Sequence, residues 1–465
     1  MTLNPYIEAH ELRELVLKKE VRPREVAEFF LARVEKLNPK LGAFMTVTRE
    51  RALADADRIE KMSAAEQRRA PMFGVPYSIK DLNWTKDIPT SMGSKNYENF
   101  RPPVDEEIVT RMRNAGGILL GKTTTPEFGG RPTTEGGLCP PARNPWNLEH
   151  TAGGSSGGAG SALGAGLGSL AQGSDGGGSI RIPSACCGVV GLKPSRGRVS
   201  MAPVAGEAWA GFATFGPMAR SVRDAATMLD VMHGPVVGDP YWAPDPATSF
   251  SAAVGIAPRH LRIGLIAKTS LAKVDSETLD ALDSAAKLFE EMGHRVEPLN
   301  CDPGGRLRDI VMPLICAGVG SVPVNDLSLV DPVVREMWEA GQKMTAVQYI
   351  GTVTQMHNMA REIVQELAPY DAVISPVTSR PAVKLGTLPS HPSRYLAELP
   401  EWIPFTFAFN ATGQPAFSVP NGFSKSGLPL AMQIVGRQAD EVTIIGLAAQ
   451  FEKARPWKDK HPPLD

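Results

Sequence analysis

A run of glycines that ends in serine is the part of this sequence best suited to nucleophilic chemistry. Gly176, Gly177 and Gly178 directly precede Ser179. A serine that attacks an acyl group needs a base to take its proton and N–H donors for the oxygen that becomes negative. Because glycines lack Cβ atoms, they can adopt backbone angles closed to other residues and aim successive N–H groups at one point. The run therefore predicts an oxyanion hole beside a nucleophilic Ser179.

The residues around this run distinguish it from a flexible linker. Taken alone, a short Gly/Ser stretch is typical of a mobile loop. Here Asp175 and Arg181 bracket the run, and apolar sequence lies on both sides of it. A flexible linker would not require a charged residue at either position. We therefore interpret residues 173–183 as a structured loop.

A second Gly/Ser segment, residues 153–158, allows more than one interpretation. Gly153, Ser155 and Gly157 formally match the nucleophile elbow of the α/β-hydrolases, and an esterase that uses Ser155 is one alternative. That motif needs a strand immediately before the serine, and residues 147–152 do not have a strand pattern. His150 could form a Ser–His pair with Ser155, but no acidic residue is placed to orient it. Both interpretations are therefore disfavoured.

Two lysines are candidates for the base. Lys80 follows the apolar run 73–79, which we interpret as a buried strand. Lys122 is a weaker rival because it lacks such an apolar strand context. A lysine has an ordinary pKa near 10.4, so it is protonated at neutral pH. Lowering that pKa by about 3 units requires about 4 kcal/mol, which burial in a dry site can supply.

Four segments together resemble the amidase signature family: residues 74–81 (GVPYSIKD), 142–147 (ARNPWN), 153–158 (GGSSGG) and 173–194 (GSDGGGSIRIPSACCGVVGLKP). The likeness extends over most of the chain. It implies a Ser–cis-Ser–Lys triad in which Ser179 is the nucleophile, Ser155 the bridging serine and Lys80 the base. Neutral Lys80 would take a proton from Ser155, which takes one from Ser179.

The resemblance also implies roles for residues around the triad. The backbone N–H groups of residues 176–179 correspond to the oxyanion hole. Positions that support the loop correspond to Ser156, Ser174, Asp175 and Arg181. Gly176 departs from the family pattern, which usually has threonine or isoleucine there.

Helical and strand patterns alternate along the rest of the chain. Helices are expected over 7–37 in two blocks, 50–69, from an N-cap at Asp105 to Asn114, 161–170, 275–292, most of 307–369, and 442–455. Strands are expected at 118–120, 261–266, 294–299, 370–376 and 416–420. This alternation predicts an α/β fold, and the resemblance implies a central mixed sheet with helices on both faces.

No linker or repeat divides the chain, so we expect one domain over residues 1–465. Within it we distinguish an N-terminal helical segment (1–70), a catalytic core (71–250), a helical cover with extra strands (251–400) and a C-terminal completion of the core (401–465).

Composition excludes several classes of function. Lys and Arg total 49 against 50 for Asp and Glu, which gives no electrostatic footprint for nucleic acid. No stretch of about 18 apolar residues predicts a membrane span, and the first twenty residues lack the pattern of a secretory signal. Five cysteines, Cys139 among them, have no CxxC spacing, and eight histidines are scattered. We therefore expect a cytoplasmic enzyme without metal or other cofactor.

Aromatic residues gather in two segments that could shape a substrate pocket, residues 201–215 and 401–410. Trp209, Phe212 and Phe405 are the candidates for its lining. We expect hydrolysis of neutral, partly hydrophobic amides, anilides, carbamates or esters, as in aryl acylamidases or urethanases. The substrate would be a small molecule and the enzyme a monomer or homodimer. A glutamine amidotransferase subunit that acts with partner chains is the alternative, although residues 401–410 show no match to its substrate-binding charges.

Overall fold

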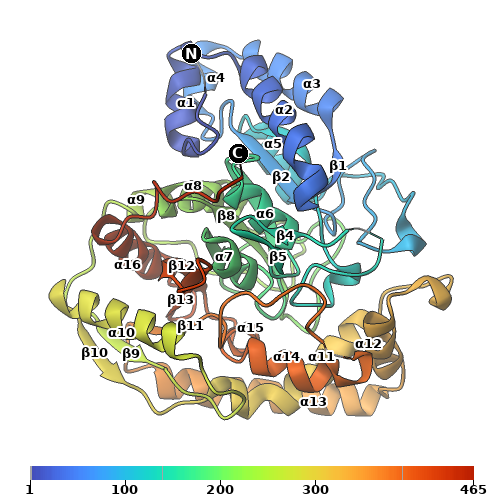
Figure 1. Cartoon of the computed structure of the whole chain (residues 1–465), viewed down its shortest axis with the longest axis vertical. Helices are drawn as coiled ribbons and strands as arrows, with labels where there is room; N and C mark the ends of the chain where they lie inside the picture. The colour runs from blue at the N-terminus through green and yellow to red at the C-terminus, as the bar shows by residue number, and fades with distance from the viewer. Residues whose placement is uncertain (1–2, 139, 390, 465) are drawn as a thin grey trace.

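An eleven-stranded mixed sheet runs through the computed structural model, which describes residues 3–138, 140–389 and 391–464 (Figure 1). In sheet order the strands are β1 (Phe44–Val47), β3 (Ile118–Thr123), β2 (Pro76–Lys80), β6 (Leu170–Asp175), β8 (Thr214–Ala219), β7 (Val190–Lys193), β12 (Ala416–Phe423), β13 (Pro429–Gly436), β11 (Ala372–Pro376), β9 (Arg262–Leu265) and β10 (Arg295–Pro298). Two further short strands, β4 (Arg143–Asn144) and β5 (Asn147–Thr151), form a separate antiparallel pair.

Helices cover both faces of the sheet. One face packs against α5 (Glu107–Asn114), α8 (Val222–Met232), α9 (Phe250–Ala253), α10 (Ser276–Glu291) and α16 (Glu441–Ala454). The other packs against α6 (Gly157–Gly164) and α7 (Arg181–Cys187), beyond which lie α11 (Pro303–Gly320), α12 (Pro332–Gln342), α13 (Ala346–Leu367), α14 (Tyr395–Trp402) and α15 (Ala408–Ala411). The N-terminal helices are α1 (Ala9–Leu17), α2 (Pro23–Leu41), α3 (Arg49–Glu60) and α4 (Ala64–Arg69).

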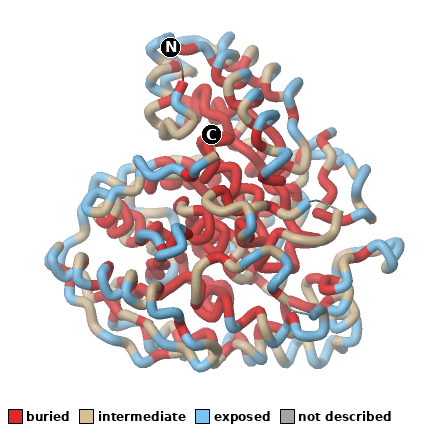
Figure 2. Tube along the Cα trace, viewed as in Figure 1, coloured by how far each residue is buried: buried red, intermediate tan, exposed pale blue. Residues whose placement is uncertain are grey.

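Strand residues alternate between the two layers of helices. Leu170 faces the layer of α8 and α16, whereas its neighbour Ala171 faces the layer of α6 and α7. Successive side chains of a strand point to opposite faces, so strands covered on both sides are apolar throughout. Figure 2 shows the result as a buried centre surrounded by half-exposed helices. The predicted α/β fold with a central mixed sheet is confirmed.

Several predicted elements differ from the structure. The helix expected over 161–170 is wrong: α6 ends at Gly164, and Leu170 begins β6, whose small and polar residues hid the strand pattern. The helix expected over 50–69 is two helices, because Ser63 caps α4. Asp105 is not an N-cap: α5 starts after Glu106, and Asp105 accepts from the backbone N–H of Lys86 instead. Residues 147–151 form a strand where none was expected.

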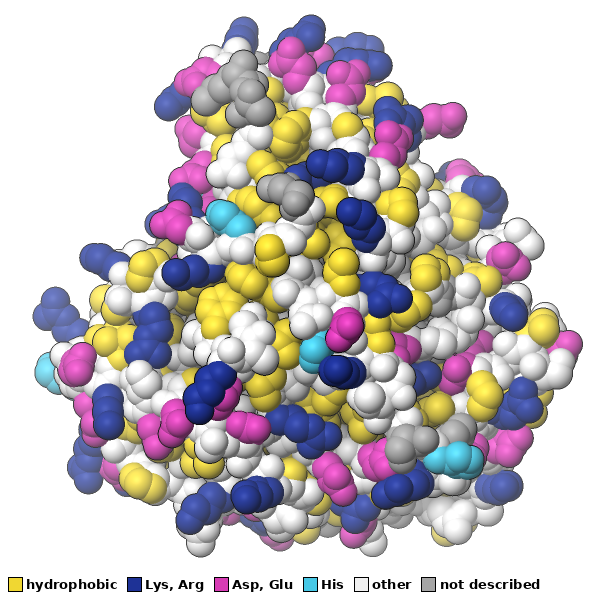
Figure 3. All heavy atoms as spheres, in the orientation of Figure 1, with side chains coloured by type: hydrophobic (Ala, Val, Ile, Leu, Met, Phe, Trp, Pro, Cys, Tyr) yellow, Lys and Arg dark blue, Asp and Glu magenta, His cyan; other side chains and the backbone are white. Residues whose placement is uncertain are grey.

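The surface view shows Lys and Arg side chains interspersed with Asp and Glu over the visible face (Figure 3). Within the described ranges, no helix combines the length and apolarity that a membrane crossing needs. Cys186, Cys187, Cys301 and Cys316 are buried free thiols, and Cys139 lies outside the described residues.

Helix α6 lies unusually close to the sheet because it is built from small residues. A Cβ atom at Gly158 would overlap backbone atoms of Thr124 and Ala43. At Gly168 a Cβ atom would meet Leu120 Cδ1 at 3.4 Å and Pro76 O at 3.9 Å, both ordinary contact distances. The absence of a side chain at Gly158 therefore lets α6 carry the preceding Ser155–Ser156 loop down onto the sheet.

We expect Gly158→Ala to lower the free energy of unfolding by about 1–3 kcal/mol, since overpacking displaces backbone. Gly168→Ala, the matched control, is expected to change it by less than about 0.5 kcal/mol. Urea unfolding measures both values. Equal losses in the two variants would contradict the close approach of α6.

Candidate active site

Two parallel strands bring the first polar groups of the site together. β2 pairs with β6 in parallel, with Tyr77 opposite Leu170 and Ser78 opposite Ala171. The carboxyl ends of parallel neighbours reach the same edge of a sheet, so Lys80 and Ser174 become neighbours there. Lys80 Nζ donates a hydrogen bond to Ser174 Oγ at 2.9 Å.

Ser155 completes the surroundings of the Lys80 amine. The loop between β5 and α6 carries it, and the peptide bond between Gly154 and Ser155 is cis. Lys80 Nζ donates to Ser155 Oγ at 2.7 Å. Lys80 is fully buried and Ser155 is only 2% exposed. The structure therefore brings together the lysine and the serine that the sequence separates by 75 positions.

Burial changes the acidity of Lys80. It lowers the pKa of the amine to about 7, although the negative charge of Asp175 acts in the opposite direction. Removal from water penalises the ammonium form more than the neutral amine. The neutral form of Lys80, which can accept a proton, is therefore accessible near pH 7.

Ser179 lies at the end of the glycine loop, next to the same serines. Its carbonyl oxygen accepts a hydrogen bond from the backbone N–H of Ser156 at 3.1 Å. Ser156 Oγ also exchanges hydrogen bonds of 3.3 Å with the backbone of Ser174. These contacts join the two Gly/Ser segments, and Ser155, Ser174 and Ser179 line one cavity of about 840 Å³.

The glycine loop presents only part of the predicted set of N–H donors. The expectation that the Gly178 N–H also belongs to an oxyanion hole is wrong, because this group donates to Asp175 Oδ1 at 2.7 Å. Gly178 has φ of +128°, a conformation that favours glycine. In the described part of the chain, no acceptor contacts the N–H groups of Gly176, Gly177 and Ser179. Gly176 and Ser179 line the cavity.

A buried ion pair fixes the shape of this loop. Arg181 Nε and Nη2 each donate to the Asp175 carboxylate at 2.9 Å, and neither side chain is exposed. Burial alone would raise the pKa of Asp175, but the charge and hydrogen bonds of Arg181 hold it well below its usual range. Such a bidentate pair fixes distance and orientation together. Asp175 and Arg181 therefore support the glycine loop through buried contacts, the kind of role expected of them from the sequence.

Three residues from the C-terminal part complete this support and were not predicted. Arg181 also donates to Thr406 O at 2.8 Å, Gln433 Oε1 at 3.1 Å and Asn410 Oδ1 at 2.6 Å. Thr406 Oγ1 in turn donates to Gly177 O at 2.7 Å. These residues lie more than 220 positions from the loop in sequence. No spacing or composition linked them to it, so only the folded chain reveals the contacts.

The rival candidates lie elsewhere. Lys122 was set aside for lacking a buried strand, and that reason is wrong, because it lies on β3 and is fully buried. Burial lowers its pKa to about 8. Its ammonium group donates to Asn83 O and Thr90 Oγ1, at 2.6 and 2.8 Å, instead of to a serine. His150 lies in β5, where its backbone forms an antiparallel β-bridge with Lys384.

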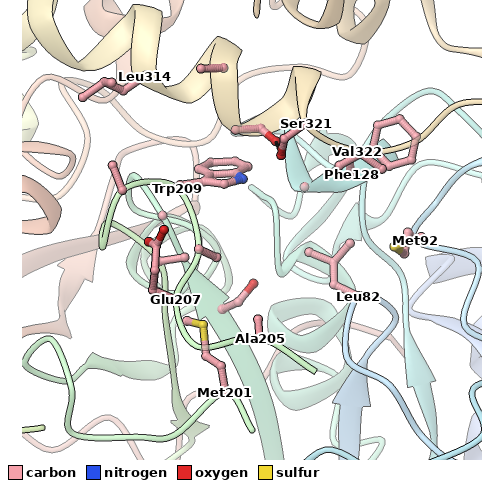
Figure 4. A pocket seen from close by; sticks show the side chains of 18 of the residues that line it. Leu82, Met92, Phe128, Met201, Ala205, Glu207, Trp209, Leu314, Ser321 and Val322 are labelled. Atoms are coloured by element: carbon pink, nitrogen blue, oxygen red, sulfur yellow. Dashed lines mark hydrogen bonds between the residues drawn. The ribbon is translucent and has the colours of Figure 1, made fainter. Parts of the chain in front are cut away.

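The cavity walls are mostly apolar, and they include one of the three predicted aromatics. Trp209 lines the cavity together with other members of the 201–215 loop. Figure 4 shows its indole across from Leu82 and Phe128. Phe212 and Phe405 belong to the apolar core, so their placement in the pocket was wrong. Residues 401–410 support the glycine loop instead of lining the cavity.

Comparison with known proteins extends these observations. Residues 25–445 match the model of the family described as Amidase. The chain belongs to the Amidase family. Members of this family hydrolyse amide C–N bonds, and the present amidase is therefore a hydrolase of that type. The α/β-hydrolase alternative is wrong, because the family match covers the segments that carry both serines.

Individual relatives cover nearly the whole chain. An acylamidase of Rhodococcus erythropolis is 34% identical over 98% of this chain and 97% of its own. A 6-aminohexanoate-cyclic-dimer hydrolase of Paenarthrobacter ureafaciens is 34% identical over 97% of this chain and 95% of its own. A solved structure of 6-aminohexanoate cyclic dimer hydrolase in complex with substrate superimposes with a TM-score of 0.92, at 31% identity, covering 99% of this chain and 100% of that one.

The Asp175–Arg181 pair gives a test of the loop support. We expect Arg181→Met to lower the free energy of unfolding by about 3–5 kcal/mol, since Asp175 would be left charged and buried without a partner. Arg306→Met removes a half-exposed arginine that pairs with Glu362 and Glu366. This control is expected to cost less than about 1 kcal/mol. Urea unfolding compares the two, and a similar small loss in both would argue against the buried pair as the support.

Proposed function

We propose that this amidase hydrolyses neutral, partly hydrophobic amides, anilides and carbamates through an acyl-enzyme on Ser179. The observation that carries the proposal is the Lys80 amine, fully buried and hydrogen-bonded to Ser155 Oγ at 2.7 Å. A dry lysine with a pKa near 7 is a base at neutral pH, and this one contacts a hydroxyl that can relay a proton.

The first half of the reaction forms the acyl-enzyme. Neutral Lys80 accepts the proton of Ser155 while Ser155 accepts that of Ser179, and Ser179 Oγ attacks the carbonyl carbon. The C–N bond then breaks, and the proton returns from Lys80 through Ser155 to the departing nitrogen. The amine leaves, and the acyl group remains on Ser179. Ser155, Ser174 and Ser179 all line the cavity in which this transfer would occur.

The second half releases the acid. Water loses a proton along the same relay and attacks the ester carbonyl, and Ser179 leaves with that proton. In both halves the carbonyl oxygen becomes negative, and the N–H groups of Gly176, Gly177 and Ser179 are the donors for it. A single donor of this kind contributes about 3–4 kcal/mol to the lowering of a barrier.

The cavity lining is unfavourable for acyl groups that carry a negative charge. Leu82, Met92, Phe128, Met201 and Trp209 give it apolar walls, and none of the described lining residues is Lys, Arg or His. The carboxylate of free glutamine would enter without a counter-charge. We therefore favour a small-molecule amidase that needs no partner chain over an amidotransferase subunit. A cytoplasmic monomer or homodimer remains our expectation.

Ser179→Ala and Lys80→Met are each expected to lower kcat/KM for p-nitroacetanilide by at least about 10⁴-fold, since each removes one member of the relay. Release of p-nitroaniline from the purified chain measures the rate. Mass spectrometry after treatment with phenylmethylsulfonyl fluoride should locate the sulfonyl group on Ser179. Sulfonylation of Ser155 with full activity in Ser179→Ala would contradict the assignment, and activity only with glutamine and partner chains would favour the amidotransferase.

The pH profile tests the base separately. Since only neutral Lys80 can accept a proton and its pKa lies at about 7, kcat/KM should be constant above that pH. Below it, the value should fall about tenfold for each pH unit as Lys80 becomes protonated. Lys80→Arg, which stays charged throughout, should show no active plateau. A rate that stays constant down to pH 5 would be incompatible with Lys80 as the base.

A further inference from the structure

The outer part of the catalytic cavity carries a negative charge that the proposed reaction does not use. Glu207, in the loop between β7 and β8, lines the cavity and is exposed. Its Oε2 accepts a hydrogen bond from the backbone N–H of Gly211 at 2.5 Å. Among the described residues, no basic side chain forms an ion pair with it. Glu207 therefore presents a carboxylate without a salt-bridge partner to whatever fills the cavity.

The second carboxylate of the cavity wall, that of Glu106, is different because buried protein groups already satisfy its hydrogen bonds. Glu106 is only 5% exposed and accepts hydrogen bonds from Asn83 Nδ2 at 2.7 Å and from Trp84 N at 3.1 Å. The nearby charge of Lys122 stabilises its ionised form, against a burial that raises its pKa to about 7. Glu106 therefore belongs to a closed internal network, whereas Glu207 faces open space.

The positive charge that interacts with Glu207, the guanidinium of Arg196, does not line the cavity. Arg196 is close enough to Glu207 to feel its field. Its guanidinium, however, donates to the carbonyl oxygens of Gly211, Asn410 and Ala411, at 2.7, 3.0 and 2.8 Å, and it does not line the cavity. Arg196 therefore fixes the loop through these carbonyls and attracts Glu207 only through space, without a salt bridge to its carboxylate.

Two aromatic side chains lie beside this carboxylate. Trp209 follows Glu207 by two residues in the same loop. Figure 4 shows Glu207 and Trp209 on one side of the cavity. The indole is held against the catalytic loop: a Cβ atom at Gly176 would lie 2.8 Å from Trp209 Cε3. Tyr349 of α13 also lines the cavity, and burial together with the charge of Glu207 raises its pKa. A carboxylate and aromatic side chains that line the same cavity are groups that attract an ammonium ion.

We propose that Glu207, Trp209 and Tyr349 form a subsite for a cationic group of the substrate. The amidase would then prefer amides that carry an alkylammonium group away from the bond to be cleaved. It would discriminate against amides of equal length that carry a carboxylate. This inference rests on the proposed function, because it concerns the substrate of the same site.

Two sets of substrates test the charge preference. The first comprises p-nitroanilides whose acyl chains have equal length and end in an ammonium, a methyl or a carboxylate group. The second comprises acetanilides with aminomethyl, ethyl or carboxymethyl groups at the para position, so that the acyl and the leaving-group sides are both covered. In at least one set, we expect kcat/KM for the cationic member to exceed that for the anionic member by about tenfold or more. The ratio should shrink at high salt.

Variants connect the preference to Glu207. Glu207→Gln keeps an oxygen for the Gly211 N–H but removes the charge, so the cation-to-anion ratio should fall to about threefold or less. Glu60→Gln, at the exposed end of α3, changes the net charge equally and should leave the ratio unchanged.

The outcomes separate the two proposals. If the neutral amides are not hydrolysed at all, the proposed function fails. If they are hydrolysed but neither set shows the charge order, or if Glu207→Gln retains the full ratio, the subsite is refuted while the hydrolase stands.

Discussion

The removal of one amine from water is the constraint on which the rest of this structure depends. Lys80 is useful as a base only if its surroundings are dry, and its side chain is fully buried at the end of β2. A buried amine still needs hydrogen-bond partners, which the hydroxyls of Ser155 and Ser174 provide. Both partners can exchange protons without becoming permanently charged. The same burial thus sets the acidity of the lysine and selects its neighbours.

The architecture around the amine follows from this requirement. Parallel pairing of β2 and β6 places Lys80 and Ser174 at one sheet edge, and the close approach of α6 brings Ser155 to the same point. Gly158 of α6 is needed because a larger side chain there would overlap the backbone of Thr124 and Ala43, which adjoin β3 and β1. Helices on both faces then exclude water. Catalytic geometry and core packing are therefore the same structural problem here.

The buried Asp175–Arg181 ion pair positions the loop that carries Ser179. Its hydrogen bonds reach the glycine loop at Gly178 and Ile180 and the C-terminal segment at Thr406 and Asn410. Asp175 thus holds the glycine loop on both sides of Ser179, and Arg181 connects it to the C-terminal segment. In contrast, surface loops together with α11 and α13 line the cavity beyond Ser179, and the hydrogen bonds of the Asp175–Arg181 pair go to other segments. That separation allows the cavity wall to vary while the relay stays fixed.

The sequence by itself determined the family and the fold class of this protein. Lys80, Ser155 and Ser179 could be selected as candidates because the segments that carry them together resemble one family, whereas each segment alone allows a structural interpretation. The continuous apolar runs of the buried strands likewise depend on near neighbours in sequence.

What only the tertiary structure decided depends on contacts between distant segments. These include the use of the Gly178 N–H by Asp175, the support from Thr406, Asn410 and Gln433, the full burial of Lys122 and the position of Phe212 and Phe405 in the core. The physical reason is that hydrogen-bond partners and burial are set by how the sheet and helices pack, and no local pattern specifies that packing. Aromatic residues look the same in sequence whether they line a cavity or fill a core.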